Sequence, residues 1–347
     1  MSDSRKRRLI LTCVAGLTAL MVVVIAGKSA SGKRAEQEAE THPVPVNLNE
    51  TLKNEMSDTS SLAGFDKMVK NYLTYWGIHG ASISVMRNDS LLFAKGYGEA
   101  DNGKKMEPGN ILRMASVSKL VTAVGIMVLQ ERGLLNLKDH VFGPDGILND
   151  STYNAAIKDT LYYRITVEDL LRHKGGFSKR GGDPMFSTRW IMMQNGWSEV
   201  PSQERLMEVQ LKRRLKFVPG TAQEYSNFGY LALSMVIEKV SGMDYETFMQ
   251  ENVLRPVGCV DFHIAGNYYK HKLPNETRYY VQHDDEPAEE FNNSGRKVTR
   301  CYGGNNVTGL SGAGAWAAST PELALFVASI DGRPEVPDII SRESVDL

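Results

Sequence analysis

The 347-residue sequence contains only three cysteines, too few to stabilise a fold through a disulfide framework. Cys13 lies within an apolar N-terminal run, which leaves Cys259 and Cys301 as the one pair that could form a bridge. The patterns Cys-x-x-Cys, His-Glu-x-x-His and His-x-His are all missing, so a metal site would need scattered ligands. The sequence therefore predicts no metal ion and no cofactor.

A strong charge of either sign is missing too. The 40 basic and 41 acidic residues leave a formal net charge of -1, so no overall field attracts nucleic acid, and we expect no nucleic-acid partner.

The Gly-x-Ser-x-Gly pattern of α/β-hydrolases is also absent, which argues against a Ser-His-Asp triad on that fold.

The N-terminal segment has the charge pattern of an export signal. Four basic residues at positions 5–8 precede an uncharged run over residues 9–26, which Lys28 closes. As a helix, this run would extend about 27 Å, near the minimum for crossing a bilayer and longer than the apolar part of most cleaved signals. The pattern favours an uncleaved anchor with the downstream chain outside the cytoplasm. Cleavage after Ala26 or Ser31 is the alternative.

These patterns divide the chain into three parts. Residues 1–27 would form a membrane anchor or signal peptide, and residues 28–60, which are polar and lack apolar periodicity, would form a tether. The folded domain would occupy residues 61–347. We expect a protein of the bacterial inner membrane whose domain faces the periplasm or the exterior.

Apolar spacing predicts the first elements of that domain. Alternating residues on both sides of Asn88-Asp89 predict a β-hairpin over residues 80–96, and most of the later chain is predicted to be helical, including residues 167–173, 228–240 and 320–330. Before the hairpin, an amphipathic helix that packs on a core is predicted by apolar residues three and four positions apart, namely Leu62, Phe65, Met68, Val69, Tyr72 and Leu73.

Ser116 and Lys119 open the most apolar helix of the chain. Residues 120–130 carry no charge, so this helix is predicted to be buried, and a lysine in its first turn opposes the helix dipole. Residues three apart share a helix face, which lets the Lys119 amine reach the Ser116 hydroxyl, and desolvation would make that amine a base near pH 7. Ser118 is interpreted as a packing residue. A second Ser-x-x-Lys, at Ser294, lies in a predicted loop and is set aside.

Tyr225 and Asn227 form a second element, directly before the predicted helix over residues 228–240. In an extended segment, residues two apart point the same way, so both side chains can face one cleft. The structural alternative is a tyrosine that packs and an asparagine that caps the helix.

Together the two elements resemble those of the penicillin-recognising serine hydrolases, which include class C β-lactamases, D-amino-acid peptidases and related esterases. The resemblance extends from about Leu62 to the end of the chain. Residues 165–177 look like the family's helix and glycine turn after the nucleophile, and Pro219-Gly220 precedes the tyrosine. Gly312-Ala313-Gly314 and residues 319–324 are similar to the segment that closes the helical region.

The resemblance implies an α+β fold, with an antiparallel central sheet and a helical region, and an envelope serine hydrolase. Ser116 would attack a carbonyl and form an acyl-enzyme, Lys119 and Tyr225 would share proton transfer, and Asn227 would hold the substrate amide. Backbone N–H groups at Ser116 would stabilise the oxyanion. The substrate would be a β-lactam, a D-amino-acid peptide or an ester, a small-molecule or peptidoglycan-like class. The alternative is a catalytically silent binding module of the same fold.

The chain departs from the family pattern near its end. The family's third motif, a Lys or His followed by a small residue and Gly on a sheet strand, does not follow residues 319–330. His173-Lys174-Gly175 has the right letters but precedes Tyr225, and it is interpreted as a helix end with a glycine cap. We therefore expect that the natural protein continues past Leu347 and that the C-terminal sheet strands are missing from this chain.

Overall fold

The computed structural model describes residues 47–180, 182–281 and 286–347. The predicted anchor and the first part of the predicted tether lie outside the described residues. Within the described ranges, no helix is both long and apolar enough to cross a membrane.

A β-hairpin and one helix form the first layer of the molecule. Strands β1 (Gly80–Arg87) and β2 (Ser90–Asp101) pair antiparallel as predicted, and both turn residues, Asn88 and Asp89, have positive φ angles, 47° and 55°. Asn and Asp tolerate this left-handed geometry, which suits a two-residue hairpin turn. The short β3 (Lys104–Lys105) extends the sheet in the order β1-β2-β3.

Helix α3 (Ala63–Trp76) packs on this hairpin through a narrower face than predicted. Val69 and Leu73 are buried against the hairpin, in a cluster that includes Phe93 and Tyr97. Met68 and Tyr72, which the periodicity placed on the buried face, are each 59% exposed. The two-stranded hairpin covers only one stripe of the helix, so the prediction was wrong for these two residues.

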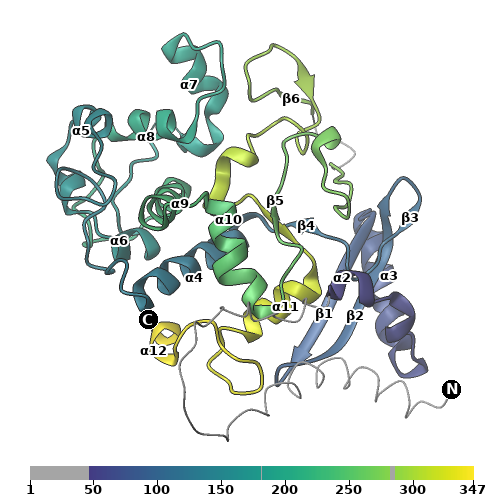
Figure 1. The fold of residues 1–347 in the computed structure, drawn as a ribbon. Coiled ribbons are helices and arrows are strands. Elements are labelled where there is room, and N and C mark those ends of the chain that lie inside the picture. Colours follow the sequence, from purple (N-terminus) through teal and green to yellow (C-terminus); the bar gives the residue numbers. More distant parts are fainter. Residues whose placement is uncertain (1–46, 181, 282–285) are drawn as a thin grey trace, which may run out of the picture.

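The larger part of the molecule is helical, and the long helices α4 and α9 lie near its centre (Figure 1). Helix α11 packs on β1, and its Phe326 is fully buried in the core of the helical region, so it connects the two layers. The helices beyond α3 and the short α2 (Leu48–Thr51) are α4 (Ser118–Glu131), α5 (Ser151–Ala156), α6 (Val167–Leu171), α7 (Thr188–Asn195), α8 (Gln203–Leu211), α9 (Asn227–Ser241), α10 (Tyr245–Met249), α11 (Thr320–Ala328) and α12 (Arg342–Asp346).

A short antiparallel sheet lies where the two layers meet. Its order is β4-β8-β5, formed by Leu112–Arg113, Trp316–Ala318 and His263–Ile264. A further pair, β6 (Ala288–Glu289) and β7 (Lys297–Val298), forms an arm on the same side of the molecule as α7 (Figure 1). The architecture is α+β with antiparallel sheets, as predicted.

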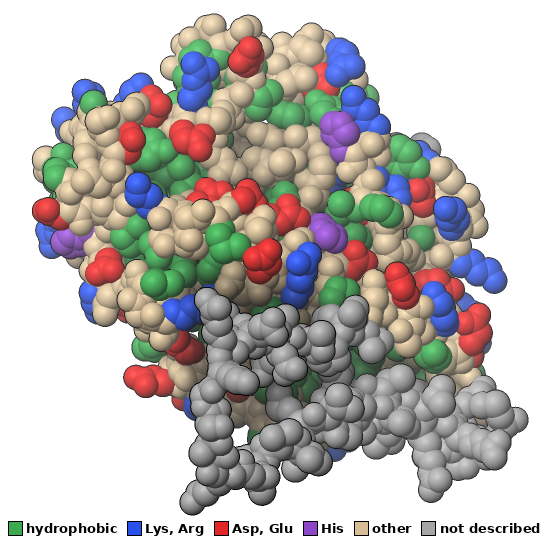
Figure 2. Space-filling view, viewed as in Figure 1, with side chains coloured by type: hydrophobic (Ala, Val, Ile, Leu, Met, Phe, Trp, Pro, Cys, Tyr) green, Lys and Arg blue, Asp and Glu red, His purple; other side chains and the backbone are tan. Residues whose placement is uncertain are grey.

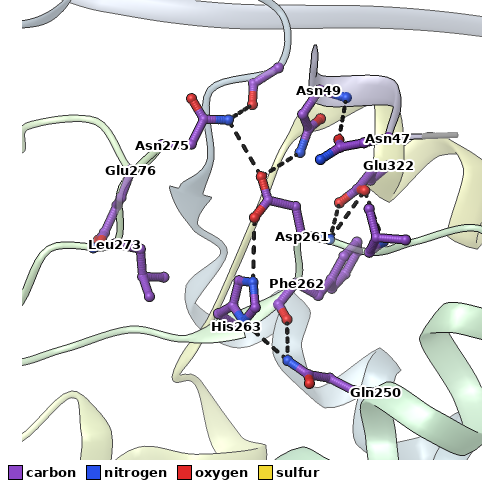
Figure 3. A network of polar contacts seen from close by, with 12 residues as sticks. Asn47, Asn49, Gln250, Asp261, Phe262, His263, Leu273, Asn275, Glu276 and Glu322 are labelled. Atoms are coloured by element: carbon purple, nitrogen blue, oxygen red, sulfur yellow. Dashed lines mark hydrogen bonds and ion pairs between the residues drawn. The ribbon is translucent and has the colours of Figure 1, made fainter. Parts of the chain in front are cut away.

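A polar network ties the N-terminal segment to the helical region (Figure 3). The Asp261 carboxylate accepts hydrogen bonds from Nδ2 of Asn49 and, at 3.4 Å, from Nδ2 of Asn275, and it lies 3.3 Å from Nε2 of His263. Glu322 of α11 accepts from the backbone N–H of Asp261 at 3.2 Å. The network therefore joins segments that lie far apart in the sequence.

The two cysteines that could have paired are not bonded to each other. The thiol of Cys259 donates to the carbonyl oxygen of Glu322 at 3.3 Å, and that of Cys301 donates to the carbonyl oxygen of Tyr279 at 3.5 Å. Burial raises the pKa of the Cys259 thiol, which makes it unreactive.

On the face shown in Figure 2, basic side chains are scattered rather than gathered into one patch.

Candidate active site

Ser116 sits in a 3-10 turn, Ala115–Val117, that leads directly into α4. The backbone before it is fixed by β8, because Met114 N–H donates to the carbonyl oxygen of Trp316 at 2.8 Å. On the other side, Trp316 N–H donates to Oγ of Ser118 at 3.1 Å, and Ser118 is fully buried. Ser118 therefore has the packing contact that the sequence indicated, and strand β8 holds Ser116 from both sides.

Ala115, immediately before the serine, has a φ angle of 47°. An alanine in this left-handed region costs about 1 kcal/mol, because its Cβ approaches the backbone. Such local strain persists only where the surrounding structure enforces it. The pairing of β4 with β8 on one side and the buried α4 on the other provide that enforcement.

The structure brings Lys119 to Ser116, three residues earlier on the same helix. Nζ of Lys119 lies 3.3 Å from Oγ of Ser116, 2.8 Å from Oδ1 of Asn227 and 2.5 Å from the carbonyl oxygen of Ala313. Lys119 is only 6% exposed. Burial lowers the pKa of its amine below the ordinary lysine value, and the attraction of Tyr225 and Asp183 offsets this only in part.

These three contacts orient the amine of Lys119 once it loses a proton. A neutral amine keeps two N–H groups and one lone pair. The oxygens of Asn227 and Ala313 accept hydrogen bonds but have no proton to donate to the amine, so they hold the two N–H groups. The lone pair is then left to face Oγ of Ser116, which is the arrangement a general base requires.

Tyr225 contacts the same hydroxyl from the opposite element. Its phenol donates to Oγ of Ser116 at 2.6 Å, and its side chain is 41% exposed, so the pair opens to solvent. Ser226, not Asn227, caps α9, because its Oγ accepts from the N–H of Gly229. The alternative of Asn227 as the helix cap is therefore wrong, and Asn227 is the first residue of the helix.

Asn227 uses both ends of its amide. Oδ1 accepts from Lys119, and Nδ2 donates to Oδ2 of Asp183 at 2.8 Å. Asp183 also accepts from the N–H of Met185 and so caps the short 3-10 helix Pro184–Phe186. Sequence reasoning missed Asp183, although an acidic residue before proline is a helix-start signal that could have drawn attention to it.

His173 is a second residue that sequence reasoning missed. Its Nδ1 accepts from the N–H of Ser226 at 3.2 Å, and its ring centre lies 4.6 Å from that of Tyr225. Burial, followed by the charges of Lys119 and Lys179, lowers the pKa of His173, so the ring is neutral near pH 7. It packs beside the tyrosine as a neutral acceptor.

The turn that carries His173 also corrects an expectation. Its φ angle is 57°, so His173 itself adopts the left-handed conformation that ends α6, and Gly175 does not. The predicted glycine cap was therefore wrong. The start of α6 agrees with the prediction, since Thr166 and Asp169 form a reciprocal capping box.

The glycine-containing segment Gly312-Ala313-Gly314 lies against α4. A Cβ on Gly312 would come within 2.7 Å of Oγ1 of Thr122 and 3.1 Å of the carbonyl oxygen of Tyr230. Thr122 also donates to the carbonyl oxygen of Gly312 at 2.8 Å. Glycine is therefore required for the close approach that brings the Ala313 carbonyl to Lys119.

The second Ser-x-x-Lys of the chain lies elsewhere. Ser294 follows β6 and precedes β7, so it occupies the predicted loop, and its hydroxyl donates to the carboxylate of Glu290. Lys297 forms an ion pair with Glu289 at 2.6 Å and is exposed. The context that separated the two motifs in the sequence also separates them in space.

Comparison with known proteins gives a consistent result. A family model described as Beta-lactamase matches residues 65–345. The chain is 25% identical to penicillin-binding protein 4* of Bacillus subtilis (strain 168) over 188 residues, which cover 54% of this chain and 37% of the relative. It is also 25% identical to a putative D-alanyl-D-alanine carboxypeptidase of Escherichia coli O157:H7, and this match covers 56% of this chain and 47% of the relative. The chain thus spans less than half of the length of these relatives.

Solved structures share the fold. D-amino acid amidase from Ochrobactrum anthropi SV3 superposes with a TM-score of 0.61 at 20% identity, covering 82% of this chain and 73% of the other. The penicillin-binding protein homologue from Pyrococcus abyssi gives a TM-score of 0.58 at 22% identity, covering 82% of this chain and 59% of the other. At these identities the likeness is one of fold.

Proposed function

The chain belongs to the β-lactamase family, and from this premise we propose that it is a serine hydrolase that forms an acyl-enzyme on Ser116. One observation carries the proposal. The hydroxyl of Ser116 lies between the Tyr225 phenol at 2.6 Å and the Lys119 amine at 3.3 Å, and the remaining contacts of that amine leave its lone pair to Ser116.

Acylation follows from this geometry. Oγ of Ser116 attacks the substrate carbonyl carbon, and its proton passes to the Lys119–Tyr225 pair. Because the two groups are coupled, they are treated as one proton acceptor. Backbone N–H groups at Ser116, with the N-terminus of α4, stabilise the oxyanion. The bond from the carbonyl carbon to the leaving nitrogen or oxygen breaks, the leaving group takes the proton from the pair, and the acyl group remains as an ester of Ser116.

Deacylation reverses the proton path. Water attacks the ester carbonyl and gives its proton to the pair, which returns it to Oγ of Ser116 as the carboxylic acid leaves. Asn227 has a second N–H on Nδ2 besides the one held by Asp183. That N–H is suited to hold a substrate amide carbonyl beside the serine.

The proposed substrates are β-lactams, D-amino-acid peptides or esters, a small-molecule or peptidoglycan-like class. The proteins that the chain resembles include a penicillin-binding protein, a putative D-alanyl-D-alanine carboxypeptidase and an amidase of D-amino acids, which supports this range.

We also propose that residues 1–27 anchor the protein in the membrane and that the domain lies outside the cytoplasm, on the basis of the charge pattern alone.

Covalent labelling tests the function. A fluorescent penicillin and a fluorophosphonate should each label the protein at one site, and the Ser116→Ala variant should lose both labels. Ser294→Ala is the matched control and should label as the parent does. A parent protein that accepts neither probe, yet binds the penicillin reversibly, would instead be a silent binding module.

A further inference from the structure

A cavity of about 250 Å³ lies between the segment that starts α7 and the arm formed by β6 and β7. These two elements stand on the same side of the molecule in Figure 1. Phe186, Arg189 and Trp190 line one wall, and Glu289 and Phe291 line the other. The cavity is large enough for a short apolar chain or a ring, although smaller than the pockets of most drug-sized ligands.

The first wall is continuous with the proposed catalytic residues. Asp183, which accepts from Asn227, also caps the 3-10 helix whose last residue, Phe186, lines the cavity. Three residues of chain span at most about 10 Å, so this wall lies within reach of a substrate held at Asn227.

The second wall is tied to the site in a similar way. Asn306 lines the cavity and accepts, through Oδ1, from the N–H of Gly309. Gly309 belongs to the 3-10 segment Thr308–Ala313, whose last carbonyl accepts from Lys119. Both walls are thus held by segments that contact the reacting groups.

The cavity lining contains one basic residue, Arg189, and one acidic residue, Glu289, and the two are only loosely joined. Glu289 pairs closely with Lys297, at 2.6 Å, whereas the distance from its other oxygen to Arg189 is 3.8 Å. Nε of Arg189 is buried, and among the described residues it has no hydrogen-bond acceptor. The side chain of Arg189 as a whole is 38% exposed, so an acceptor that enters the cavity meets the exposed part of the guanidinium rather than Nε. Lys297, which lies outside the lining, is thus the closer partner of Glu289, and Arg189 is left only loosely paired.

Three aromatic side chains share the cavity lining with Arg189. Phe186 and Trp190 are 50% and 46% exposed, although large aromatic residues are usually buried, and Phe291 is largely buried in the same lining. The cavity therefore combines three aromatic side chains and a loosely paired cation with the polar groups of Ser187, Thr188, Asn305 and Asn306, a mixture that is typical of ligand sites.

We propose that this cavity binds the distal part of the acyl substrate, and that Arg189 pairs there with a carboxylate at the end of an apolar chain. The inference rests on the proposed function, because it places the reacting carbonyl at Ser116. It specifies the substrate class further, as acyl donors that carry a carboxylate several bonds from the carbonyl. Guanidinium groups suit this role, since their N–H groups match the two oxygens of a carboxylate.

The test compares two esters that differ only in the distal group, mono-p-nitrophenyl suberate and its methyl ester. The parent protein should hydrolyse the acid with a kcat/KM roughly tenfold to a hundredfold higher than that of the methyl ester, the range for a hydrogen bond to a charged group. Arg189→Met should lose this preference because the KM for the acid rises. Its kcat/KM for the methyl ester should stay within about twofold of the parent value. Arg205→Met is the control, because Arg205 is exposed and stacks on Trp197, outside the cavity lining.

Binding separates the two proposals. In the Ser116→Ala background, the affinity for suberic acid monoamide should exceed that for its methyl ester, and Arg189→Met should remove the difference. If Arg189→Met keeps the parent's preference for the acid over the methyl ester, and its circular dichroism is unchanged, the assignment of the cavity is overturned. Absence of hydrolysis and labelling together with Arg189-dependent binding would instead overturn the proposed function alone.

Discussion

Nζ of Lys119 donates to the main-chain carbonyl of Ala313, which lies 194 residues further along the chain. This contact and the one to Asn227 use two of the three positions around the nitrogen, and the third faces Ser116. The orientation of the proposed base therefore depends on a backbone segment as much as on side chains. That segment can approach α4 only because position 312 is glycine.

Replacing Lys119 with methionine should nearly abolish acylation while the protein stays folded. The change removes the base, and it also removes a buried charge whose desolvation opposes folding, which offsets the lost hydrogen bonds. Labelling with fluorophosphonate and a thermal unfolding curve measure the two effects. Lys297→Met, at the second Ser-x-x-Lys, is the matched control and should label normally. Undiminished labelling of Lys119→Met would remove the assignment of this residue.

Replacing Tyr225 with phenylalanine should slow turnover by about two to four orders of magnitude, the usual range for one proton-transfer group. The phenol donates directly to Ser116, and the ring itself is retained. Tyr230→Phe is the comparison, because that ring also lies near Lys119 while its hydroxyl donates to the carbonyl oxygen of Leu171. If Tyr225→Phe costs less than roughly tenfold, below that range, its hydroxyl has no catalytic role.

Asp183→Ala should lower kcat by roughly tenfold to a hundredfold, the range for losing a hydrogen bond to a charged group. Without its acceptor, the Asn227 amide is free to rotate away from Lys119. Asp183→Asn keeps an oxygen that can accept and should recover part of the activity. An alanine variant with normal kcat, or an asparagine variant no better than alanine, would show that Asp183 does not position Asn227.

His263 should make stability depend on pH. Asp261, which contacts the ring in Figure 3, raises the pKa of His263 from 6.5 to about 9 in the folded state, and Glu246 is the second cause. Because the folded-state pKa is the higher one, the stabilisation is complete below about pH 6.5 and is lost as the pH rises through about 9. Urea unfolding gives the free energy of unfolding of the parent and of His263→Gln at each pH. The parent value minus the variant value should fall over this window, by on the order of 1 kcal/mol for a partly exposed pair. A flat difference would show that the ion pairs contribute nothing.

The full chain should fractionate with membranes, and a protease added to intact spheroplasts should reach the domain. The basic residues at positions 5–8 orient the apolar run with its N-terminus in the cytoplasm. A chain lacking residues 1–27 should be recovered in the soluble fraction. Mature protein that begins near Gly27 or Gly32 would indicate cleavage of a signal peptide instead.

The amino-acid sequence alone predicted the features that depend on local periodicity. A serine and a lysine three apart in a helix share a face whatever surrounds them, and Asn88-Asp89 favours a hairpin turn through its own backbone preferences. Tyr225 and Asn227 were placed in one cleft on the premise of an extended segment. Asn227 instead begins α9 after the extended Ser226, and the two side chains still meet at Ser116 and Lys119. The first two relations need no knowledge of the remaining fold.

Only the tertiary structure decided the contacts between distant segments. Asp183 is 44 residues from Asn227, and His173 is 53 residues from Ser226, so no spacing in the sequence could have joined them. Periodicity identified the apolar residues of α3 but could not tell that the hairpin would leave Met68 and Tyr72 exposed. The physical reason is the same in each case. Spacing fixes which way a side chain points, whereas the packing of whole elements fixes what it meets there.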